Sequence, residues 1–387
     1  MKYLPTRLAA AAAALIALWP SAMLAAPAWE QWQAVPAVFD LGGPRVDGSL
    51  VVAASAALYT LTPAGDLAPF ARGPGGYRDD PNTEAYLESS PGLHVAAAGC
   101  DFARDDLYLL RLHTPVGLTR VDGTGQETGS FANIDAPSLN GIAFDTAGAF
   151  DHRLLVTAPL AGKTELFAVD CRGSSQVITK TAPPVEGGMA VAPETFGDFA
   201  GSLIAPDENS GLIWAIAPDG SAKQVVNPGL PKGGDIGVES VAFVPPEFSK
   251  GGYVYYADRK SANTQYIGTD HVLRLASADL VAAGVQDGDL LAATEGGASL
   301  VAVRCAATCR VITVIGSPGA AHGEGHIVFT LTQQPSPTPS ATLAPSATPA
   351  ASSSAVGAAA PMIAVAAAVL AALVGAFVAV TASRRRR

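Results

Sequence analysis

The sequence predicts an all-β protein: a six-bladed β-propeller in which both termini complete one blade, followed by a C-terminal transmembrane helix. Three observations lead to this prediction. The central region consists of short apolar runs separated by turn residues, in a chain with 40 Gly and 29 Pro among 387 residues. These runs recur with a period of about 40–50 residues, which is typical of propeller blades. The two ends have the composition of a targeting signal and of a membrane span.

Composition excludes several classes of protein. A hydrophobic content of 49% excludes a disordered chain, and the Gly and Pro content argues against a helical bundle. The net charge of −10 argues against nucleic-acid binding, which needs clustered Lys and Arg. Six of the 24 basic residues lie in the two ends, which leaves the region between them at −16 (18 − 34). That charge favours cations or neutral ligands.

Residues 1–26 have the features of a secretory signal peptide. Lys2 and Arg7 precede an apolar run from Leu8 to Trp19, and small residues allow cleavage after Ala25 or Ala28. An uncleaved anchor is the alternative, but the apolar run is shorter than the roughly 20 residues of a membrane span.

The C-terminal end predicts a single membrane span. Residues 333–359 are rich in Pro, Ser, Thr and Ala, as in an extended stalk, and residues 361–383 are almost wholly apolar. Four arginines, 384–387, end the chain and predict a cytoplasmic tail. The expected location is therefore the cell membrane, with the N-terminal domain extracellular. A buried core helix and a cleaved surface-sorting tail are the alternatives.

Residues 38–332 carry the predicted propeller. An aromatic residue holds the same place in three units, LYTLTPAG, LFAVDCRG and IWAIAPDG. A second series of apolar strands, expected to be innermost, follows His94, Asn140, Glu186, Glu239 and Glu324, at spacings of 46, 46, 53 and 85 residues. The last interval is close to two units. A pair of β-sandwiches is the alternative.

The ends of this repeat predict how the ring closes. The first unit begins at GSLVVAAS without an innermost strand, and the last segment, HIVFT, is an innermost strand without the rest of its blade. Together they are expected to complete one blade, which protects the edges. The fifth-to-sixth junction is irregular around Asp279, where residues 277–285 are the one helical candidate.

The four cysteines predict two disulfides. Cys305 and Cys309 flank a three-residue turn between strands, and Cys100 and Cys171 are expected on one face of neighbouring blades. A metal pair in the CxxxC segment is the alternative.

The loops before the innermost strands, here termed the leading loops, meet at one end of a propeller's channel. They carry Asn140, Glu186, Glu239 and Glu324, and only Lys180 and Lys232 are expected nearby as bases. Clustered carboxylates repel one another unless protons or a cation intervene. Oxygen ligands suit Ca²⁺ foremost, or Mg²⁺ or Mn²⁺, and a solvated polar channel is the alternative. Other loops expected at this face carry Asp207, Glu208, Asn209, Asp258 and Glu295.

The segment from His322 to His326 has a second interpretation. Its spacing is not that of a helical zinc site, but alternate residues of an extended strand point the same way. His322, Glu324 and His326 on one face would form a zinc or iron site.

Short motifs resemble the gluconolactonase family, which includes the luciferin-regenerating enzymes, and the NHL-repeat propellers. Leu139-Asn140-Gly141-Ile142 is similar to a strand start whose Asn binds a divalent metal in the lactonases. Glu324-Gly325 is similar to the motif of a second ligand, although it lies at the C-terminal end. Glu186-Gly187-Gly188-Met189 departs from the third motif, because Gly187 replaces its Asp. The resemblance implies a propeller over residues 40–330 and, as one possibility, lactonase chemistry.

Two functions follow as expectations. The first is a membrane-anchored, monomeric ligand-binding or scaffold domain, whose ligand is a small molecule, a glycan or a surface protein. The second is a metal-dependent hydrolase of the lactonase type, in which Asp258 or Glu295 is the general base. A quinone-dependent oxidoreductase is disfavoured by the few basic residues. The sequence carries no nucleophile elbow, phosphate-binding loop or dinucleotide motif.

Overall fold

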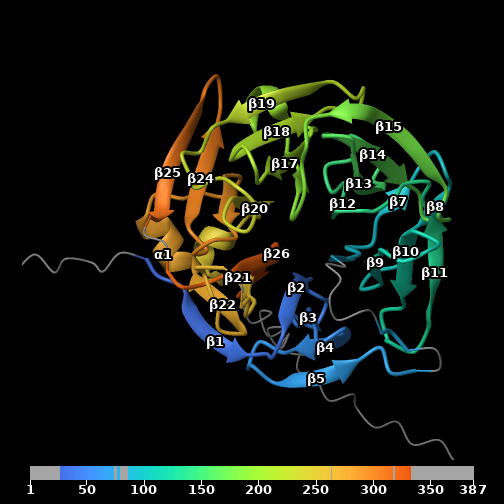
Figure 1. Ribbon diagram of the computed structural model, residues 1–387, viewed down its shortest axis with the longest axis horizontal. Coiled ribbons are helices and arrows are strands. Elements are labelled where there is room, and N and C mark those ends of the chain that lie inside the picture. The colour runs from blue at the N-terminus through green and yellow to red at the C-terminus, as the bar shows by residue number, and fades with distance from the viewer. Residues whose placement is uncertain (1–26, 74–75, 79–85, 263, 317–318, 333–387) are drawn as a thin grey trace, which may run out of the picture. The chain divides into compact units, whose positions relative to one another are not determined.

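Six four-stranded antiparallel sheets surround a central axis, so the predicted six-bladed propeller is confirmed (Figure 1). The computed structural model describes residues 27–332 except 74–75, 79–85, 263 and 317–318. The predicted signal peptide, stalk and transmembrane helix at 1–26, 333–359 and 361–383 lie outside the described residues. Within the described part, no helix has both the length and the apolar character needed to cross a membrane.

Blades 1, 3 and 4 each follow the chain from the innermost strand outward. Blade 1 consists of β2 (Val38–Gly42), β3 (Leu50–Ala54), β4 (Ala57–Leu61) and β5 (Leu67–Phe70). Blade 3 consists of β12 (Gly141–Phe144), β13 (Leu154–Leu160), β14 (Lys163–Val169) and β15 (Ser175–Ala182). Blade 4 consists of β16 (Ala190–Val191), β17 (Leu203–Asp207), β18 (Leu212–Ile216) and β19 (Ala222–Val226), with a short 3₁₀ turn at Gly197–Phe199.

Blade 2 contains an inserted hairpin between its first two strands. Its strands are β6 (Leu87–Ser89), β9 (Leu107–Arg111), β10 (Gly117–Val121) and β11 (Thr128–Asn133), and the hairpin is β7 (His94–Val95) with β8 (Cys100–Asp101). The expectation that an innermost strand follows His94 is therefore wrong. The innermost strand is three residues long, which is too short for its apolar pattern to be recognised in the sequence.

Blades 5 and 6 are interlocked along the chain. Blade 5 consists of β20 (Val238–Phe243), β23 (Leu290–Thr294), β24 (Leu300–Cys305) and β25 (Cys309–Ile315). Blade 6 consists of β26 (Gly323–Leu331), β21 (Gly252–Asp258), β22 (His271–Ala276) and β1 (Glu30–Ala34). The chain thus leaves blade 5 after β20, builds two strands of blade 6, and returns through α1 (Ser277–Ala282) to complete blade 5. A short 3₁₀ turn at Phe248–Lys250 precedes β21, and α1 is the predicted helix at the irregular junction.

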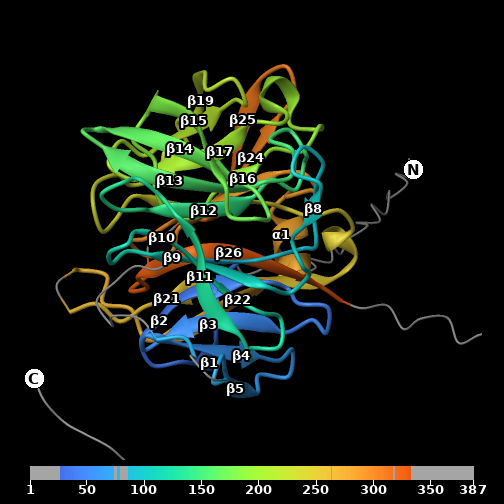
Figure 2. The same cartoon turned by 90° about the vertical axis from the view of Figure 1, so that its right-hand side faces the viewer.

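Both termini complete one blade, as predicted, but with different partners. The C-terminal β26 is innermost in blade 6 and the N-terminal β1 is outermost, each against a strand of the β21–β22 hairpin. Blade 1 has its own innermost strand, β2, which the sequence analysis missed. That strand, VFDLG, includes a buried Asp40 in its apolar run, so its pattern was broken. In the side view β26 crosses the molecule from one face to the other (Figure 2).

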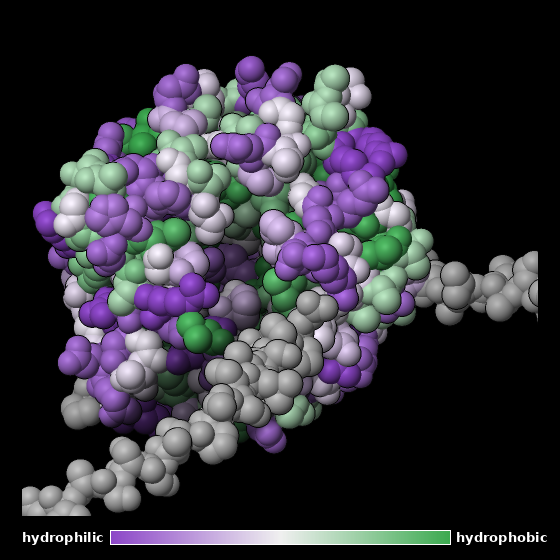
Figure 3. Space-filling view, turned by 180° about the vertical axis from the view of Figure 1, so that it is seen from behind, coloured by the Kyte–Doolittle hydropathy of each residue, from purple (hydrophilic) through white to green (hydrophobic). Residues whose placement is uncertain are grey.

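Burial follows the distance of a strand from the axis. Every residue of β2, β9 and β23 is buried, because inner strands pack between neighbouring blades on both faces. Most residues of the outermost strands β11 and β15 are half-buried or exposed. The face in Figure 3 is hollowed near its centre, and hydrophilic and hydrophobic residues are mixed over its described part.

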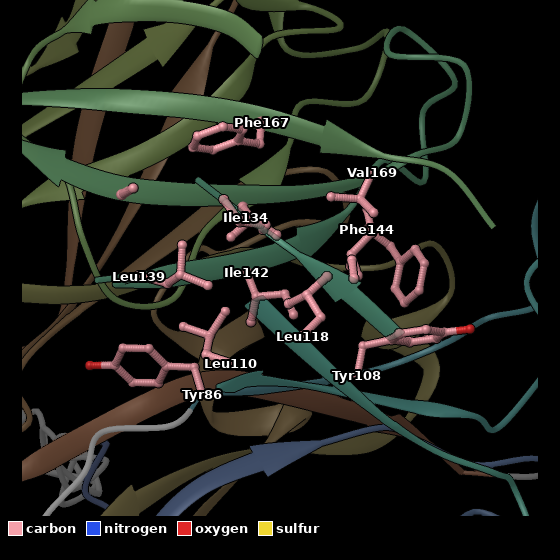
Figure 4. Close-up of a cluster of buried hydrophobic side chains, with 14 of the residues drawn as sticks. Tyr86, Tyr108, Leu110, Leu118, Ile134, Leu139, Ile142, Phe144, Phe167 and Val169 are labelled. Atoms are coloured by element: carbon pink, nitrogen blue, oxygen red, sulfur yellow. The ribbon is translucent and has the colours of Figure 1, made fainter. Parts of the chain in front are cut away.

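Aromatic and aliphatic side chains pack together between blades 2 and 3 (Figure 4). Phe102 packs edge-on against Phe144, with ring centroids 5.0 Å apart, and Tyr108 lies edge-on to Phe131 at 4.8 Å. Such edge-to-face pairs add to the stabilisation from burial alone. Tyr86 lies at one side of this cluster, with its hydroxyl directed away from the other labelled side chains (Figure 4).

Both predicted disulfides are present. Cys100–Cys171 joins the β7–β8 hairpin of blade 2 to the turn between β14 and β15 of blade 3, and Cys305–Cys309 closes the β24–β25 hairpin. The described residues include no free cysteine. The first bridge connects two blades and the second lies within one, so the two bridges constrain the chain differently.

An ionic cluster of buried Asp40 and His326 with half-buried Glu88 lies at the axis. Both ring nitrogens of His326 face oxygen atoms: Nδ1 lies 3.0 Å from Asp40 and Nε2 lies 2.9 Å from the Ile142 carbonyl. Neither oxygen can donate, so the geometry fits an imidazolium that donates from both nitrogens. Burial alone would lower the pKa of His326, but the charge and hydrogen bond of Asp40 outweigh it and raise the pKa to about 9.

Asp40 holds three blades together through this cluster. Its carboxylate accepts hydrogen bonds from the backbone N–H groups of Leu41, Leu87 and His326, each at 2.7 Å. Burial, and the charge of Asp40, raise the pKa of the neighbouring Glu88 to about 7. A carboxylate that accepts this many hydrogen bonds holds the innermost strands of these blades in place.

Candidate functional site

The leading loops of blades 3 to 6 meet at one end of the axis, as their equivalent positions predicted. Backbone hydrogen bonds join them to one another and to the residue after β23; three of the four bonds pass between blades, and the bond from Glu295 to Gly237 lies within blade 5. The four bonds are Gly187 N–H to Asn140 O (2.9 Å), Gly188 N–H to Glu239 O (3.0 Å), Glu295 N–H to Gly237 O (2.9 Å) and Gly323 N–H to Glu295 O (2.7 Å). The chain segments that carry the predicted site residues are therefore held in fixed register.

Four carboxylates and one imidazole gather at this end of the axis. We define the central site as Glu208, Glu239, Glu295, His322 and Glu324, none of which is more than 8% exposed. Glu208 directly follows β17, and Glu295 directly follows β23. Glu239 is the second residue of β20, His322 directly precedes β26, and Glu324 is the second residue of β26. Buried acids at this density require protons, cationic side chains or a metal ion to offset their charge.

His322 lies between two of these carboxylates. Its Nε2 is 3.0 Å from Glu295 Oε1 and 3.4 Å from Glu324 Oε1, and one potential ligand atom from each residue lies within 4.8 Å of the others. Burial alone would lower the pKa of His322, but hydrogen bonds to Glu295 and Glu324 raise it to about 10. The Nδ1 atom of His322 is buried and has no hydrogen-bond partner.

Two tyrosines border the central site. Tyr86 Oη donates a 2.7 Å hydrogen bond to Glu239 Oε1, which explains the outward direction of this hydroxyl in Figure 4. Tyr256 is fully buried, and its hydroxyl has no hydrogen-bond partner. Burial raises the pKa of Tyr256, and the charges of Glu239, Glu324, Glu295 and Glu208 raise it further, so this hydroxyl lies among the carboxylates.

Two of the four carboxyl groups, those of Glu208 and Glu239, have raised pKa values. Burial, followed by the hydrogen bond and charge of Glu295, raises the pKa of Glu208 to about 9. Burial also raises the pKa of Glu239 well above its ordinary range, and the charge of Glu324 adds to this effect. The site therefore combines proton-holding acids with the ion pairs around His322.

Arg259 is the cationic side chain that sequence analysis missed. Its Nη1 lies 3.1 Å from Glu324 Oε1, and its guanidinium lies 5.4 Å from the centre of the Phe39 ring. The expectation that only Lys180 and Lys232 approach the channel is therefore wrong; Lys180 pairs instead with Glu165 at 2.7 Å. Its position in the sequence could have indicated this role, because Arg259 directly follows the strand that ends at Asp258, a residue already expected at this face.

The predicted metal residues lie at this end of the axis, but only some belong to the central site. Glu239 and Glu324 belong to it. Glu186 is half-buried, and its charge contributes to the raised pKa of Glu208. The side chain of Asn140 donates to the Val185 carbonyl at 3.0 Å, and its buried Oδ1 has no hydrogen-bond partner.

The two predicted general bases differ in their surroundings. Glu295 lies in the central site. Asp258 is fully buried and accepts hydrogen bonds from Thr269 Oγ1 (2.5 Å), Thr269 N–H (3.1 Å) and His322 N–H (2.8 Å). Burial is the main cause of its raised pKa. Asp258 therefore positions the backbone of His322 and the loop that carries Thr269.

The HGEGH segment does not place both histidines on one side. His322 and Glu324 face each other, whereas His326 contacts Asp40 and Ile142. Gly325 has a φ of +68°, and the pairing of β26 with β21 shifts register nearby, so the regular alternation of a strand is interrupted. The expected shared face of the three side chains is therefore wrong.

Gly187 is a glycine because the neighbouring blade leaves no space for a side chain. Its φ is +73°, and a Cβ atom there would overlap the carbonyl oxygen of Glu239 and lie 2.8 Å from its Oε1. The side chain of an Asp, which the third motif has at this position, would therefore not fit here.

We expect Gly187→Ala to lower the free energy of unfolding by about 2–3 kcal/mol, from left-handed strain plus overlap with backbone that cannot move away. Gly162→Ala is the matched control, since Gly162 has a φ of +75° with nothing within 4 Å of the added Cβ, and should cost only about 1 kcal/mol. Urea unfolding measures both. Equal losses would show that the contact with Glu239 has no energetic weight.

Comparisons with known proteins show similarity of fold. No family model matches the sequence, and no curated protein matches it. Among solved structures, the chain is similar to a nidogen/laminin complex, with 10% identity, 77% of this chain and 86% of that chain covered, and a TM-score of 0.45. It is also similar to a putative gluconolactonase, with 14% identity, 60% of this chain and 71% of that chain covered, and a TM-score of 0.35. A luciferin-regenerating enzyme matches with 12% identity, 64% of this chain and 95% of that chain covered, and a TM-score of 0.32. The kinds of propeller that the motifs resemble are thus among the matches, and no residue role is transferred from them.

Proposed function

We propose that this protein is an exported, membrane-anchored β-propeller that binds a ligand, or acts as a scaffold, at the cell surface. We propose further that a divalent cation occupies its central site. Cation binding is supported by four buried glutamates, contributed by three blades, that converge around a tyrosine hydroxyl without a hydrogen-bond partner. The predicted signal peptide and the apolar segment at 361–383 support the location.

The ligand class follows from the charge of the exported region. With a net charge of −16, that region favours cations and neutral molecules over polyanions. A small molecule, a glycan or a surface protein that meets the end of the axis at the central site fits this charge. We propose that the protein works as a monomer.

We expect a divalent cation to raise the melting temperature of the purified full-length protein in mild detergent. Binding to the folded state alone stabilises it by roughly 2.7 kcal/mol at a concentration of 100 times the dissociation constant. The experiment compares melts in EDTA with melts after addition of Ca²⁺, Mg²⁺, Mn²⁺ or Zn²⁺.

Glu324→Gln should lose most of this stabilisation, because it removes one carboxylate charge from the central site without changing the size of the side chain. If no cation changes the melting temperature of either the wild type or the variant, the central site binds no cation, and only a polar channel with protonated carboxyl groups remains.

A second function, a metal-dependent hydrolase of the lactonase type, is supported by the pairing of Glu208 with Glu295. Glu208, whose pKa is raised to about 9, holds a proton beside the carboxyl group of Glu295, and a pair of adjacent carboxyl groups is an arrangement that general acid–base catalysis uses. A bound cation would supply polarisation of a lactone carbonyl. Glu295 would accept the proton of the attacking water, and Asp258 would hold the backbone of His322 in place.

A panel of lactones tests this function. Hydrolysis should require added metal and should be lost in Glu295→Gln when the variant is assayed at a metal concentration that saturates its own melting-temperature shift. No turnover by the metal-loaded wild type would reject the hydrolase and leave the binding function in place.

A further inference from the structure

The donor set of the central site is more specific than a ring of carboxylates. Glu295, His322 and Glu324 each direct one potential ligand atom into a volume in which these atoms lie within 4.8 Å of one another. A metal ion bonded at about 2.0–2.2 Å holds its ligand atoms roughly 3–4 Å apart. The 3.0 Å and 3.4 Å separations from His322 Nε2 to the two carboxylates fall in this range.

The backbone fixes these three residues before any ion binds. His322 N–H donates to Asp258 Oδ1 at 2.8 Å, and the His322 carbonyl accepts from Arg259 N–H at 2.8 Å. Glu295 accepts from Gly323 N–H through its carbonyl at 2.7 Å, which links the two segments that carry the ligands. Arg259 also donates to the Glu324 carboxylate, as outer residues of metal sites do when they orient a ligand.

Two unpartnered buried atoms point to a missing component. Tyr256 has no exposed surface, and its hydroxyl has no partner although it lies among the carboxylates. His322, 3% exposed, leaves Nδ1 without a partner. Buried polar groups are almost always hydrogen-bonded, so a hydroxyl in this position fits a site that holds an ion with its water.

We infer that Glu295, His322 and Glu324 bind one transition-metal ion of the zinc class in preference to Ca²⁺ or Mg²⁺. The inference rests on the proposed function in assuming that the central site takes a cation. An imidazole nitrogen suits Zn²⁺ and its neighbours in the first transition row, whereas Ca²⁺ takes six to eight oxygen ligands and Mg²⁺ retains much of its water. Two carboxylates and one imidazole leave a fourth position for water or a ligand, next to the Tyr256 hydroxyl.

The test measures metal selectivity of the full-length protein in detergent after treatment with a chelator. Zn²⁺ affinity is determined by competition with a chromophoric chelator, and Ca²⁺ affinity by isothermal titration. Co²⁺ serves as a spectroscopic substitute, because a site of low coordination number gives strong visible absorption that hydrated Co²⁺ lacks. We expect one Zn²⁺ per chain, Co²⁺ absorption that Zn²⁺ abolishes, and much weaker binding of Ca²⁺.

Variants assign the site. His322→Gln should weaken Zn²⁺ binding by roughly 100-fold or more, since loss of an outer residue alone typically costs 10–100-fold. His94→Gln is the control, because His94 lies far along the chain in an exposed pair with Asp101 and should leave Zn²⁺ binding unchanged. Glu295→Gln repeats the test with a second ligand, in case His322→Gln does not fold.

The outcomes separate this inference from the proposed function. Zn²⁺ binding that survives both His322→Gln and Glu295→Gln overturns the inference. Tight binding of Ca²⁺ with weak binding of Zn²⁺ also overturns it, but leaves the proposed cation in place. Failure of every cation to bind the wild type removes both.

Discussion

Asp40→Asn is expected to lower the free energy of unfolding by about 3–5 kcal/mol, the usual effect of removing one partner from a buried ion pair. The Asp40 side chain is fully buried, and its carboxylate accepts from three backbone N–H groups and faces the His326 ring. An asparagine of the same size loses the charge opposite the imidazolium, and its NH₂ group would meet a donor instead of an acceptor.

The protein contains a matched control for this prediction. His94 and Asp101 form the same type of pair at 2.7 Å, but their side chains are 60% and 72% exposed. Asp101→Asn should therefore change stability by less than about 1 kcal/mol. Urea unfolding followed by tryptophan fluorescence compares the two variants. Similar losses in the free energy of unfolding would show that burial does not increase the contribution of the Asp40–His326 pair to stability.

The same pair predicts a pH dependence. The pKa of His326 is about 9 in the folded protein, above the ordinary value of 6.5, so the folded state binds this proton more tightly than the unfolded state. The resulting stabilisation is fully present below about pH 6.5 and is lost as the pH rises through about 9. His322 titrates in the folded protein near pH 10. The difference between wild type and Asp40→Asn therefore reports on His326 above about pH 8, where Glu88, whose pKa of about 7 also depends on Asp40, has already ionised. Parallel pH profiles in that range would contradict this assignment.

Removal of the Cys100–Cys171 disulfide should destabilise the protein by about 4 kcal/mol, because the bridge closes a loop of 71 residues in the unfolded chain. Cys305–Cys309 spans only 4 residues, and the same chain-entropy relation gives about 2 kcal/mol for it. The double variants Cys100→Ser/Cys171→Ser and Cys305→Ser/Cys309→Ser keep the chain otherwise identical.

Chemical unfolding of the two double variants under non-reducing conditions measures this difference. The long-range bridge should also matter for the attachment of the β7–β8 hairpin to blade 3. A smaller loss from the 71-residue loop than from the hairpin loop would mean that unfolded-state entropy does not govern these bridges.

The fold was predictable because its signal is repeated. Asn140 and Glu186 precede the innermost strands of blades 3 and 4, and Glu239 lies at the start of the innermost strand of blade 5. Repetition of a local pattern indicates the architecture even where the pattern of a single strand is weak. The closing blade was harder to predict. β2 carries Asp40 in its apolar run, and the order of β21, β22 and β23 depends on contacts between segments far apart in the chain, which periodicity does not report.

The central site was predictable in position and less so in composition. Equivalent strand starts placed Glu239 and Glu324 together, and Glu208 and Glu295 came from loops expected at the same face. The participation of Arg259 depends on a direction of the side chain that the sequence does not encode locally. His326 was assigned to the wrong side because a single left-handed glycine, Gly325, changes the alternation of the strand.

The innermost position of the C-terminal strand has a mechanical consequence. The described chain leaves the propeller directly after β26, which is paired along its length with β21, from Gly252 opposite Leu331 to Asp258 opposite Gly323. A pulling force on the chain beyond Leu331 acts along this strand, so the ladder of hydrogen bonds is loaded in shear and its bonds share the force. If the C-terminal segment tethers the protein to a membrane, the tension acts first on the innermost strand of blade 6, which neighbouring blades surround. It does not act on an outer strand, whose hydrogen bonds would break one after another.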